Sequence, residues 1–256
     1  MISYCIAAYR PQYTRALVES LVGKTSAPFE VLLWLNVADE GFEGWIAGRQ
    51  AAGAPIRVVG QSPDNIGMRA YARLLSESRY EMVVQIDDDV ICVSPGIAET
   101  AAEVFAKFPR VGMLTADTWQ DAYTNGARPP MSHYRLVDAG WGLYDGPIDG
   151  WFSIYRKSAL ARCGLPRLDR YTFLGGRIKQ RLARIGMQGL LCTRFRVFHA
   201  TGPEYASYFG LLEFEIEKYR SLGRHDIVEW YSSARDRLPD REVLGRQVER
   251  IFSLLS

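Results

Sequence analysis

Three consecutive aspartates, Asp87, Asp88 and Asp89, follow an apolar run at residues 83–86. Because side chains alternate along an extended backbone, we expect Asp87 and Asp89 to point to one side and Asp88 to the other. Two carboxylates on one side can hold Mg²⁺ or Mn²⁺, whose open positions accept the phosphates of a nucleoside diphosphate. Capping of a helix that starts at Ser94-Pro95 is the alternative, but a cap needs one acid and not three. The run therefore predicts a metal site.

The first half of the chain alternates short apolar, β-branched runs with stretches of helical period, which is typical of a doubly wound α/β sheet. Polar residues follow the first, second and fourth of the expected strands, at the sheet edge where ligands bind in this class of fold. We expect strands over 2–8, 29–35, 56–59, 82–86 and 111–115, with helices near 14–22, 41–51, 68–78 and 95–107.

Residues 118–150 are rich in Gly, Pro, Trp and Tyr and have no clear period. This composition predicts a long functional loop that contacts an acceptor. Beyond it we expect a strand over 151–155, a helix over 177–185, a strand over 193–198 and helices from about residue 205.

A length of 256 residues fits one large α/β domain, with or without a small appendage. The apolar share of 48% and charged share of 23% exclude a disordered tail protein. No run approaches the ~20 apolar residues of a membrane-spanning helix, and the N-terminus reads as a strand, so we expect a cytoplasmic protein. Four scattered cysteines predict core side chains and neither a disulfide nor a zinc site.

Charge is unevenly distributed, although the whole chain carries only +2. Residues 151–200 contain eleven basic side chains and one acid, a block of +10. Such a block is often a solvated helix face, but it also suits a polyanion or an anionic membrane surface. Its members are Arg156, Lys157, Arg162, Arg167, Arg170, Arg177, Lys179, Arg181, Arg184, Arg194 and Arg196.

In their order and spacing, five motifs resemble the nucleotide-sugar glycosyltransferases of the GT-A fold, of the family 2-like type with an Asp-X-Asp (DXD) motif. The resemblance covers residues 1–202 and implies a mixed, doubly wound sheet. It implies a Rossmann-like nucleotide-sugar-binding half at 1–117, an acceptor half at 118–202 and a helical C-terminal extension at 203–256. The motifs are Ala8-Tyr9-Arg10-Pro11, Asn65-Ile66-Gly67-Met68-Arg69, the aspartate run, residues 149–156, and His199.

The resemblance also implies roles for single residues. Asp87 and Asp89 would hold Mn²⁺ or Mg²⁺, with His199 as a third ligand, and the co-substrate would be a nucleotide-sugar, with a UDP-sugar favoured. Arg69 or Arg73 would reach the diphosphate, unless these are ordinary exposed arginines. The full set of donor-binding candidates is Ala8, Tyr9, Arg10, Asn36, Asn65, Gly67, Arg69, Asp88 and Trp151.

The general base does not follow from the motif. Inverting relatives carry an acidic pair at the start of a helix, where this chain has Leu174 and Gly175. Asp149, which precedes a strand that lines the acceptor site in relatives, is the catalytic candidate, although it also suits a plain turn. Asp145, Asp169 and Glu204 are the reserves, and both inversion and retention of configuration stay open.

The expected function is metal-dependent transfer of a sugar to an acceptor hydroxyl on a glycan or a lipid-linked sugar. A hydroxylated base of DNA, bound through phosphates on the basic 151–200 block, is a second acceptor class. A nucleotidyltransferase is disfavoured because residues 7–11 contain no glycine for a phosphate loop. A non-catalytic module that binds sugar or nucleic acid is the alternative from another class.

Overall fold

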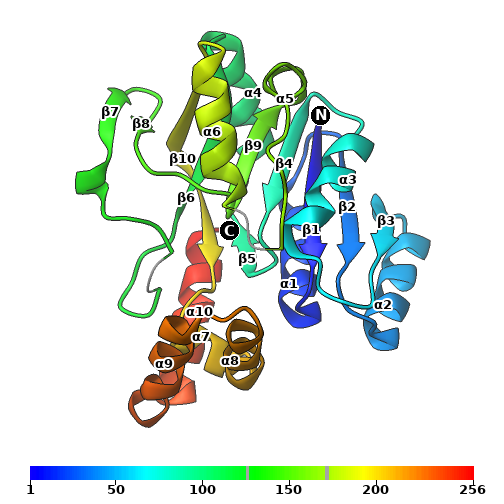
Figure 1. Ribbon diagram of the computed structural model, residues 1–256, viewed down its shortest axis with the longest axis vertical. Helices are drawn as coiled ribbons and strands as arrows, with labels where there is room; N and C mark the ends of the chain where they lie inside the picture. Colours follow the sequence, from blue (N-terminus) through cyan, green and yellow to red (C-terminus); the bar gives the residue numbers. More distant parts are fainter. Residues whose placement is uncertain (125–126, 171–172) are drawn as a thin grey trace.

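The computed structural model describes residues 1–124, 127–170 and 173–256. Across these residues the chain forms a ten-stranded mixed sheet in the order β3-β2-β1-β4-β9-β6-β10-β8-β7, with β5 paired to β10 (Figure 1). The strands are β1 (Ile2–Ala8), β2 (Phe29–Leu35), β3 (Ile56–Gln61), β4 (Met82–Ile86), β5 (Val90–Val93), β6 (Val111–Thr118), β7 (Arg135–Asp138), β8 (Leu143–Asp145), β9 (Phe152–Arg156) and β10 (Gln188–His199).

The N-terminal half has the parallel arrangement that the sequence predicts. β1 pairs with β2 on one side and with β4 on the other, and β2 pairs with β3, all in parallel. Strands β1, β2 and β4 have the expected bounds, whereas β3 and β6 extend further because Gln61 still pairs with Leu35 and Thr118 with Val197. Apolar residues on both faces of β1 and β4 are buried, as expected for the centre of a parallel sheet.

The strand order reverses between β1 and β4. The chain runs outward from β1 through β2 to β3, and then returns to the other side of β1 as β4. In open α/β sheets this switch point leaves a crevice at the carboxyl ends of the two strands. Residues 8–10 and the aspartate run therefore meet at the same place.

The aspartate run is a turn and not an extended segment. The Val90 amide donates to the Asp87 carbonyl at 3.0 Å, and the chain enters β5 at once. The predicted helix start at Ser94-Pro95 is wrong, because the Ser94 amide donates to the Arg196 carbonyl at 2.9 Å and so continues the pairing with β10. Helix α4 begins only after Gly96, whose φ of 72° lies in the left-handed region.

Helices cover both faces of the sheet: α3 and α6 cross in front of it in Figure 1, and α4 lies behind. Helix α6 buries Leu174, Ile178 and Leu182, one side chain per turn. It begins three residues earlier than predicted. The helices before the C-terminal group are α1 (Pro11–Lys24), α2 (Glu40–Ala51), α3 (Ala70–Glu77), α4 (Ile97–Lys107), α5 (Lys157–Cys163) and α6 (Leu174–Arg184), with short 3₁₀ turns η1 (Gly67–Arg69) and η2 (Met131–His133).

The expected loop at 118–150 contains regular structure. Strands β7 and β8 form an antiparallel pair, and β8 adds to the sheet through β10. Residues 125 and 126 of the predicted loop lie outside the described residues. Strand β10 begins at Gln188, earlier than predicted, and its pairing with β6 shifts register between Cys192 and Arg196.

Four helices follow the sheet: α7 (Pro203–Tyr208), α8 (Leu212–Ser221), α9 (His225–Ala234) and α10 (Arg241–Leu254), with the 3₁₀ turn η3 (Arg235–Arg237) before α10. Figure 1 shows them gathered below the carboxyl ends of β1 and β10. Asp121 fastens this group to the sheet by accepting hydrogen bonds from Tyr205 of α7, Gln247 of α10 and Trp119. No helix of the part that the structure describes has the length and apolarity to cross a membrane.

The substitution Asp121→Ala is expected to lower the free energy of unfolding by about 2 kcal/mol at pH 7, because Tyr205, Gln247 and Trp119 lose their shared acceptor. Burial raises the pKa of Asp121, but the hydrogen bonds from Gln247, Tyr205 and two backbone amides together lower it. A carboxyl group with a lowered folded-state pKa stabilises at neutral pH, so the difference from wild type should shrink below about pH 4. Urea titrations across pH measure both effects. The exposed Glu249→Ala on α10 is the control, and equal losses in the two variants would contradict the role of Asp121.

Candidate active site

A cavity of about 360 Å³ lies at the switch point between β1 and β4. Its wall combines carboxylates, amides and aromatic rings from segments far apart in the sequence. The wall residues are Ala7, Tyr9, Arg10, Asn36, Asn65, Gly67, Met68, Tyr71, Asp87, Asp88, Asp89, Ala127, Arg128, Pro129, Asp149, Trp151, Arg170, Phe173, His199, Thr201, Lys218, Tyr219 and Leu222.

Asp87, Asp89 and His199 converge in this wall, with one ligand atom from each lying within 4.8 Å of the others. The turn between β4 and β5 supplies the two aspartates. The antiparallel pairing of β5 with β10 supplies His199, which lies opposite Val90, and the Ala200 amide donates to the Asp89 carbonyl at 2.8 Å. The three residues therefore meet because β5 forms.

The donor set fits a divalent cation. Asp87 Oδ1 and His199 Nδ1 are buried and have no hydrogen-bond partner within the described ranges, a costly state for polar atoms. Burial, and then the charge of Asp89, raise the pKa of Asp87 to about 7. A cation beside these carboxylates would relieve both penalties. Two carboxylates and an imidazole are ligands that Mn²⁺ and Mg²⁺ accept in proteins.

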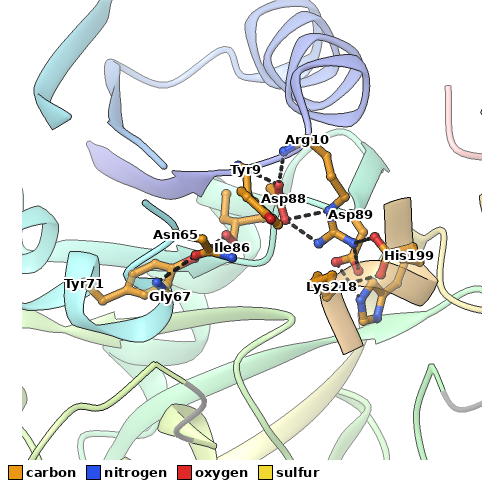
Figure 2. Close-up of polar contacts among 11 residues, drawn as sticks. Tyr9, Arg10, Asn65, Gly67, Tyr71, Ile86, Asp88, Asp89, His199 and Lys218 are labelled. Atoms are coloured by element: carbon orange, nitrogen blue, oxygen red, sulfur yellow. Dashed lines mark hydrogen bonds and ion pairs between the residues drawn. The ribbon is translucent and has the colours of Figure 1, made fainter. Parts of the chain in front are cut away.

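Arg10 connects the aspartates to the rest of the fold (Figure 2). Its side chain is only 8% exposed, and Nη1 lies 3.0 Å from Asp89 Oδ2 and 2.8 Å from Glu215 Oε1. Nε donates to Asp88 Oδ1 at 3.1 Å, and Nη2 bonds to the same oxygen. Burial opposes the ionisation of Asp89, but Arg10 and His199 together hold its pKa well below the usual range.

Asp88 is bonded to the end of β1 through both of its carboxylate oxygens. Its Oδ2 accepts hydrogen bonds from the amides of Tyr9 at 2.8 Å and Arg10 at 2.7 Å. With Oδ1 occupied by the Arg10 guanidinium, Asp88 holds the end of β1 against the β4–β5 turn. The expected alternation assumed an extended backbone, whereas the run is a turn in which Asp88 and Asp89 both contact Arg10.

The ionised groups around Arg10 are out of balance. Four carboxylates, from Asp87, Asp88, Asp89 and Glu215, surround the two cations Arg10 and Lys218. With all four carboxylates ionised and His199 neutral, as in a metal-bound site, the excess of two negative charges equals the charge of one divalent cation. The charge count therefore agrees with the unpartnered ligand atoms.

Polar residues predicted from the resemblance line the opposite end of the cavity. Asn36 Oδ1 accepts from the Ile66 amide at 3.1 Å, and Asn65 Oδ1 accepts from the Gly67 amide at 2.8 Å. Gly67 has a φ of 57°, and a Cβ atom there would lie 2.0 Å from the Arg170 carbonyl oxygen. Only glycine fits this close approach, which shapes the wall between the two asparagines.

Three of the residues predicted to contact the donor, Arg69, Ala8 and Trp151, are less available to a ligand than the others. Arg69 is exposed on η1 and lies outside the described cavity wall. Ala8 is fully buried, and its neighbour Ala7 lines the wall instead. Trp151 lines the wall as a buried residue whose indole N–H donates to the Ala116 carbonyl at 2.8 Å.

Asp149 lies at the N-terminus of α6. Its Oδ1 accepts from the amides of Gly150 at 2.8 Å, Gly175 at 2.9 Å and Gly176 at 3.3 Å. A Cβ atom on Gly175 would lie 2.5 Å from the Asp149 backbone, so glycine permits this contact. Burial raises the pKa of Asp149 although the amides oppose it. Asp149 thus lies at the start of α6, where the sequence lacks the acidic pair of the inverting enzymes.

Several wall residues were not predicted as functional. Arg128, Arg170 and Phe173 come from loops, and Lys218 comes from α8 in the C-terminal extension. Arg128 is held by Asp117, its Nε lying 2.6 Å from Asp117 Oδ1. No motif marks these positions, and only the folded chain brings them to the aspartates.

No protein-family model and no curated protein sequence matches this chain. Solved structures do resemble it. The mannosyltransferase PcManGT from Pyrobaculum calidifontis, in complex with GDP-Man and Mn²⁺, is 14% identical over 88% of this chain and 62% of its own, with a TM-score of 0.61. A fragment of S. aureus TarS in complex with UDP-GlcNAc is 15% identical over 83% of this chain and 63% of its own, with a TM-score of 0.60.

GalNAc-T7 with UDP, GalNAc and Mn²⁺ is 14% identical over 78% of this chain, with a TM-score of 0.61. This chain spans 43% of GalNAc-T7 and about three fifths of the other two. At these identities the likeness establishes the fold. The predicted GT-A-type α/β architecture is confirmed.

Substitutions at Asp87 and Asp88 are expected to affect stability in opposite ways in the metal-free protein. Asp88→Asn should lower the free energy of unfolding by about 3 kcal/mol, because it leaves Arg10 short of a buried counter-charge. Asp87→Asn should leave stability unchanged or raise it, because it removes a buried charge with an unpartnered oxygen. Chemical denaturation in EDTA compares the two. A loss at Asp87 as large as that at Asp88 would contradict this division of roles.

Proposed function

We propose that this chain is a metal-dependent glycosyltransferase that moves a sugar from a nucleoside-diphosphate sugar to an acceptor hydroxyl. The observation that carries the proposal is the convergence of Asp87, Asp89 and His199 at the β1/β4 switch point. PcManGT, TarS and GalNAc-T7, which share the fold, are described with GDP-Man, UDP-GlcNAc and UDP respectively, and two of them with Mn²⁺. Ligand atoms without partners support a metal-bound working state.

In this proposal the nucleoside lies along Tyr9, Asn36, Asn65 and Gly67. Asn36 Oδ1 is already occupied by the Ile66 amide, so the side-chain N–H groups of Asn36 remain to donate. They would recognise a base carbonyl, which uracil and guanine carry and adenine lacks. A UDP-sugar is the favoured donor, with a GDP-sugar as the second choice.

Asp87, Asp89 and His199 would hold Mn²⁺ or Mg²⁺, while Arg10 orients Asp89 from behind. When bound, the cation neutralises the charge that develops on the diphosphate as the sugar leaves. Asp88 has its oxygens on Arg10 and on backbone amides, so its part is to fix the site's shape.

Asp149 is the proposed general base. Three amides hold its Oδ1, which leaves Oδ2 to accept a proton from the acceptor hydroxyl. Asp149 also borders a second cavity of about 120 Å³ that it shares with Asp87, so the acid lies beside the metal site. A base at this position assists attack from the face opposite the leaving group, and we propose inversion of configuration.

The proposed acceptor is a carbohydrate or lipid-linked hydroxyl. The DNA alternative depends on the basic 151–200 block presenting one free face. Part of that block is used within the fold, because five members are partly buried and bond to protein carbonyls or carboxylates. These are Arg156, Lys157, Lys179, Arg181 and Arg196.

Incubation with Mn²⁺ and a panel of UDP- and GDP-sugars tests the proposal. We expect metal-dependent release of one nucleoside diphosphate, with loss of release and of Mn²⁺ binding in Asp89→Ala because the cation loses a ligand. Asp236→Ala, an exposed acid on η3, should behave like wild type. Binding of sugars or nucleic acid without release from any donor would overturn the proposal in favour of a non-catalytic module.

Asp149→Asn is expected to lower kcat by about 10²–10⁴-fold while donor affinity changes little, because the amide cannot take the proton. Single-turnover kinetics with the donor identified above give the rate, and the anomeric configuration of the product by NMR gives the stereochemistry. Asp145→Asn is the matched control, since Asp145 pairs with Lys179 and Arg135 away from the metal residues. An unchanged kcat in Asp149→Asn, or a product of retained configuration, would remove Asp149 as base.

A further inference from the structure

Helix α8, far along the chain from the aspartates, forms part of the cavity wall. Lys218, Tyr219 and Leu222 at its C-terminal end border the cavity together with Asp89 and His199. Figure 2 shows Lys218 beside Asp89 and His199. The C-terminal extension therefore contributes side chains to the site as well as packing against the sheet.

Two contacts fix α8 relative to the end of β1. Glu215 is buried and accepts from Arg10 Nη1 at 2.8 Å, the same nitrogen that pairs with Asp89. One residue earlier, the Phe214 ring packs on Tyr9 with ring centroids 4.9 Å apart. Because α8 shares Arg10 with the metal residues, it presents Lys218 to the site in a defined position.

Lys218 has hydrogen-bonding capacity to spare. Its side chain is 12% exposed, and Nζ donates to Glu215 Oε2 at 2.6 Å. An ammonium group has three donors, and this bond is the one that Nζ makes within the described residues. Packing over the Tyr219 ring, 4.4 Å from its centroid, further restrains the side chain. A restrained ammonium loses little entropy when it binds an anion.

The other arginines that line the cavity are placed differently. Arg10 is enclosed, with Nε, Nη1 and Nη2 all on carboxylates. Arg128 is held by Asp117 and the Pro129 carbonyl. The backbone carbonyl of Arg170 lies against Gly67, at the end of the cavity where the nucleoside is proposed to lie. Of the two cations paired with the described carboxylates Asp88, Asp89 and Glu215, Lys218 is thus the one with donors available for a ligand.

Charge indicates which ligand. A divalent cation would bring the cluster of four carboxylates, Arg10 and Lys218 to neutrality, and a diphosphate would then add negative charge. We infer that Lys218 binds the diphosphate group of the nucleotide donor, on the side of the metal that α8 covers. The inference deepens the proposed function and rests on it.

Isothermal titration with UDP, GDP and the matching monophosphates, in the presence of Mn²⁺, tests the inference on the full chain. Lys218→Met is expected to weaken diphosphate binding about 10-fold or more and to weaken monophosphate binding less. Diphosphate binding by this variant should also depend less on salt concentration. Lys218→Gln, which can still donate to Glu215, should show the same loss, whereas Lys218→Arg should recover most of the affinity. Arg220→Met on the same helix, an exposed residue paired with Glu217, should match wild type.

The outcomes separate the two claims. If wild type binds a diphosphate and Lys218→Gln binds it equally well, the inference is overturned while the proposed function stands. Equal losses for diphosphate and monophosphate, with no recovery in Lys218→Arg, would indicate a packing role and also overturn it. If wild type binds no nucleoside diphosphate with Mn²⁺, the proposed function fails and the inference falls with it.

Discussion

The buried guanidinium of Arg10 is the interaction on which the rest of the site depends. It joins three parts of the chain: the end of β1, the turn after β4, and helix α8. A buried ion pair gains little over apolar packing, but removing one partner leaves an uncompensated charge. With Asp88, Asp89 and Glu215 on one arginine, movement of any of these segments would expose such a charge. The network thereby fixes the geometry of the site.

Much of the site could be predicted because its chemistry is local. Asp87 and Asp89 follow a strand whose apolar pattern is plain, and His199 ends another, so their place at one edge of the sheet could be expected. Strand β5 was missed because its four residues precede Ser94-Pro95, which suits a helix start, and because its partner β10 lies about a hundred residues away. Its pairing is non-local, and local propensity gives no sign of it.

The acidic pair that is missing from the start of α6 shows a second limit, which is that a motif position does not locate the general base. Leu174 and Gly175 stand where acids were expected, and from the sequence the general base therefore had no clear place. In the fold, the N-terminal amides of α6 donate to the carboxylate of Asp149 from the preceding loop, and the small Gly175 allows the approach. A helix N-terminus favours an anion from whatever segment provides it. An acid therefore lies at the N-terminus of α6, although it comes from a different position in the sequence.

The same reasoning explains why the C-terminal helices belong to the site. Asp87, Asp88 and Asp89 in one turn repel one another, and Arg10 alone does not balance them. Glu215 alone would add to the negative charge, but Lys218 lies one turn later on α8 and pairs with it. The helix therefore adds no net charge through this pair. Helix α8 can therefore bind Arg10 through Glu215 without changing the net charge beside Asp87 and Asp89, where the metal ion is proposed to bind. With the four carboxylates ionised and His199 neutral, two negative charges remain beside Arg10 and Lys218, which is the charge that one divalent cation would balance.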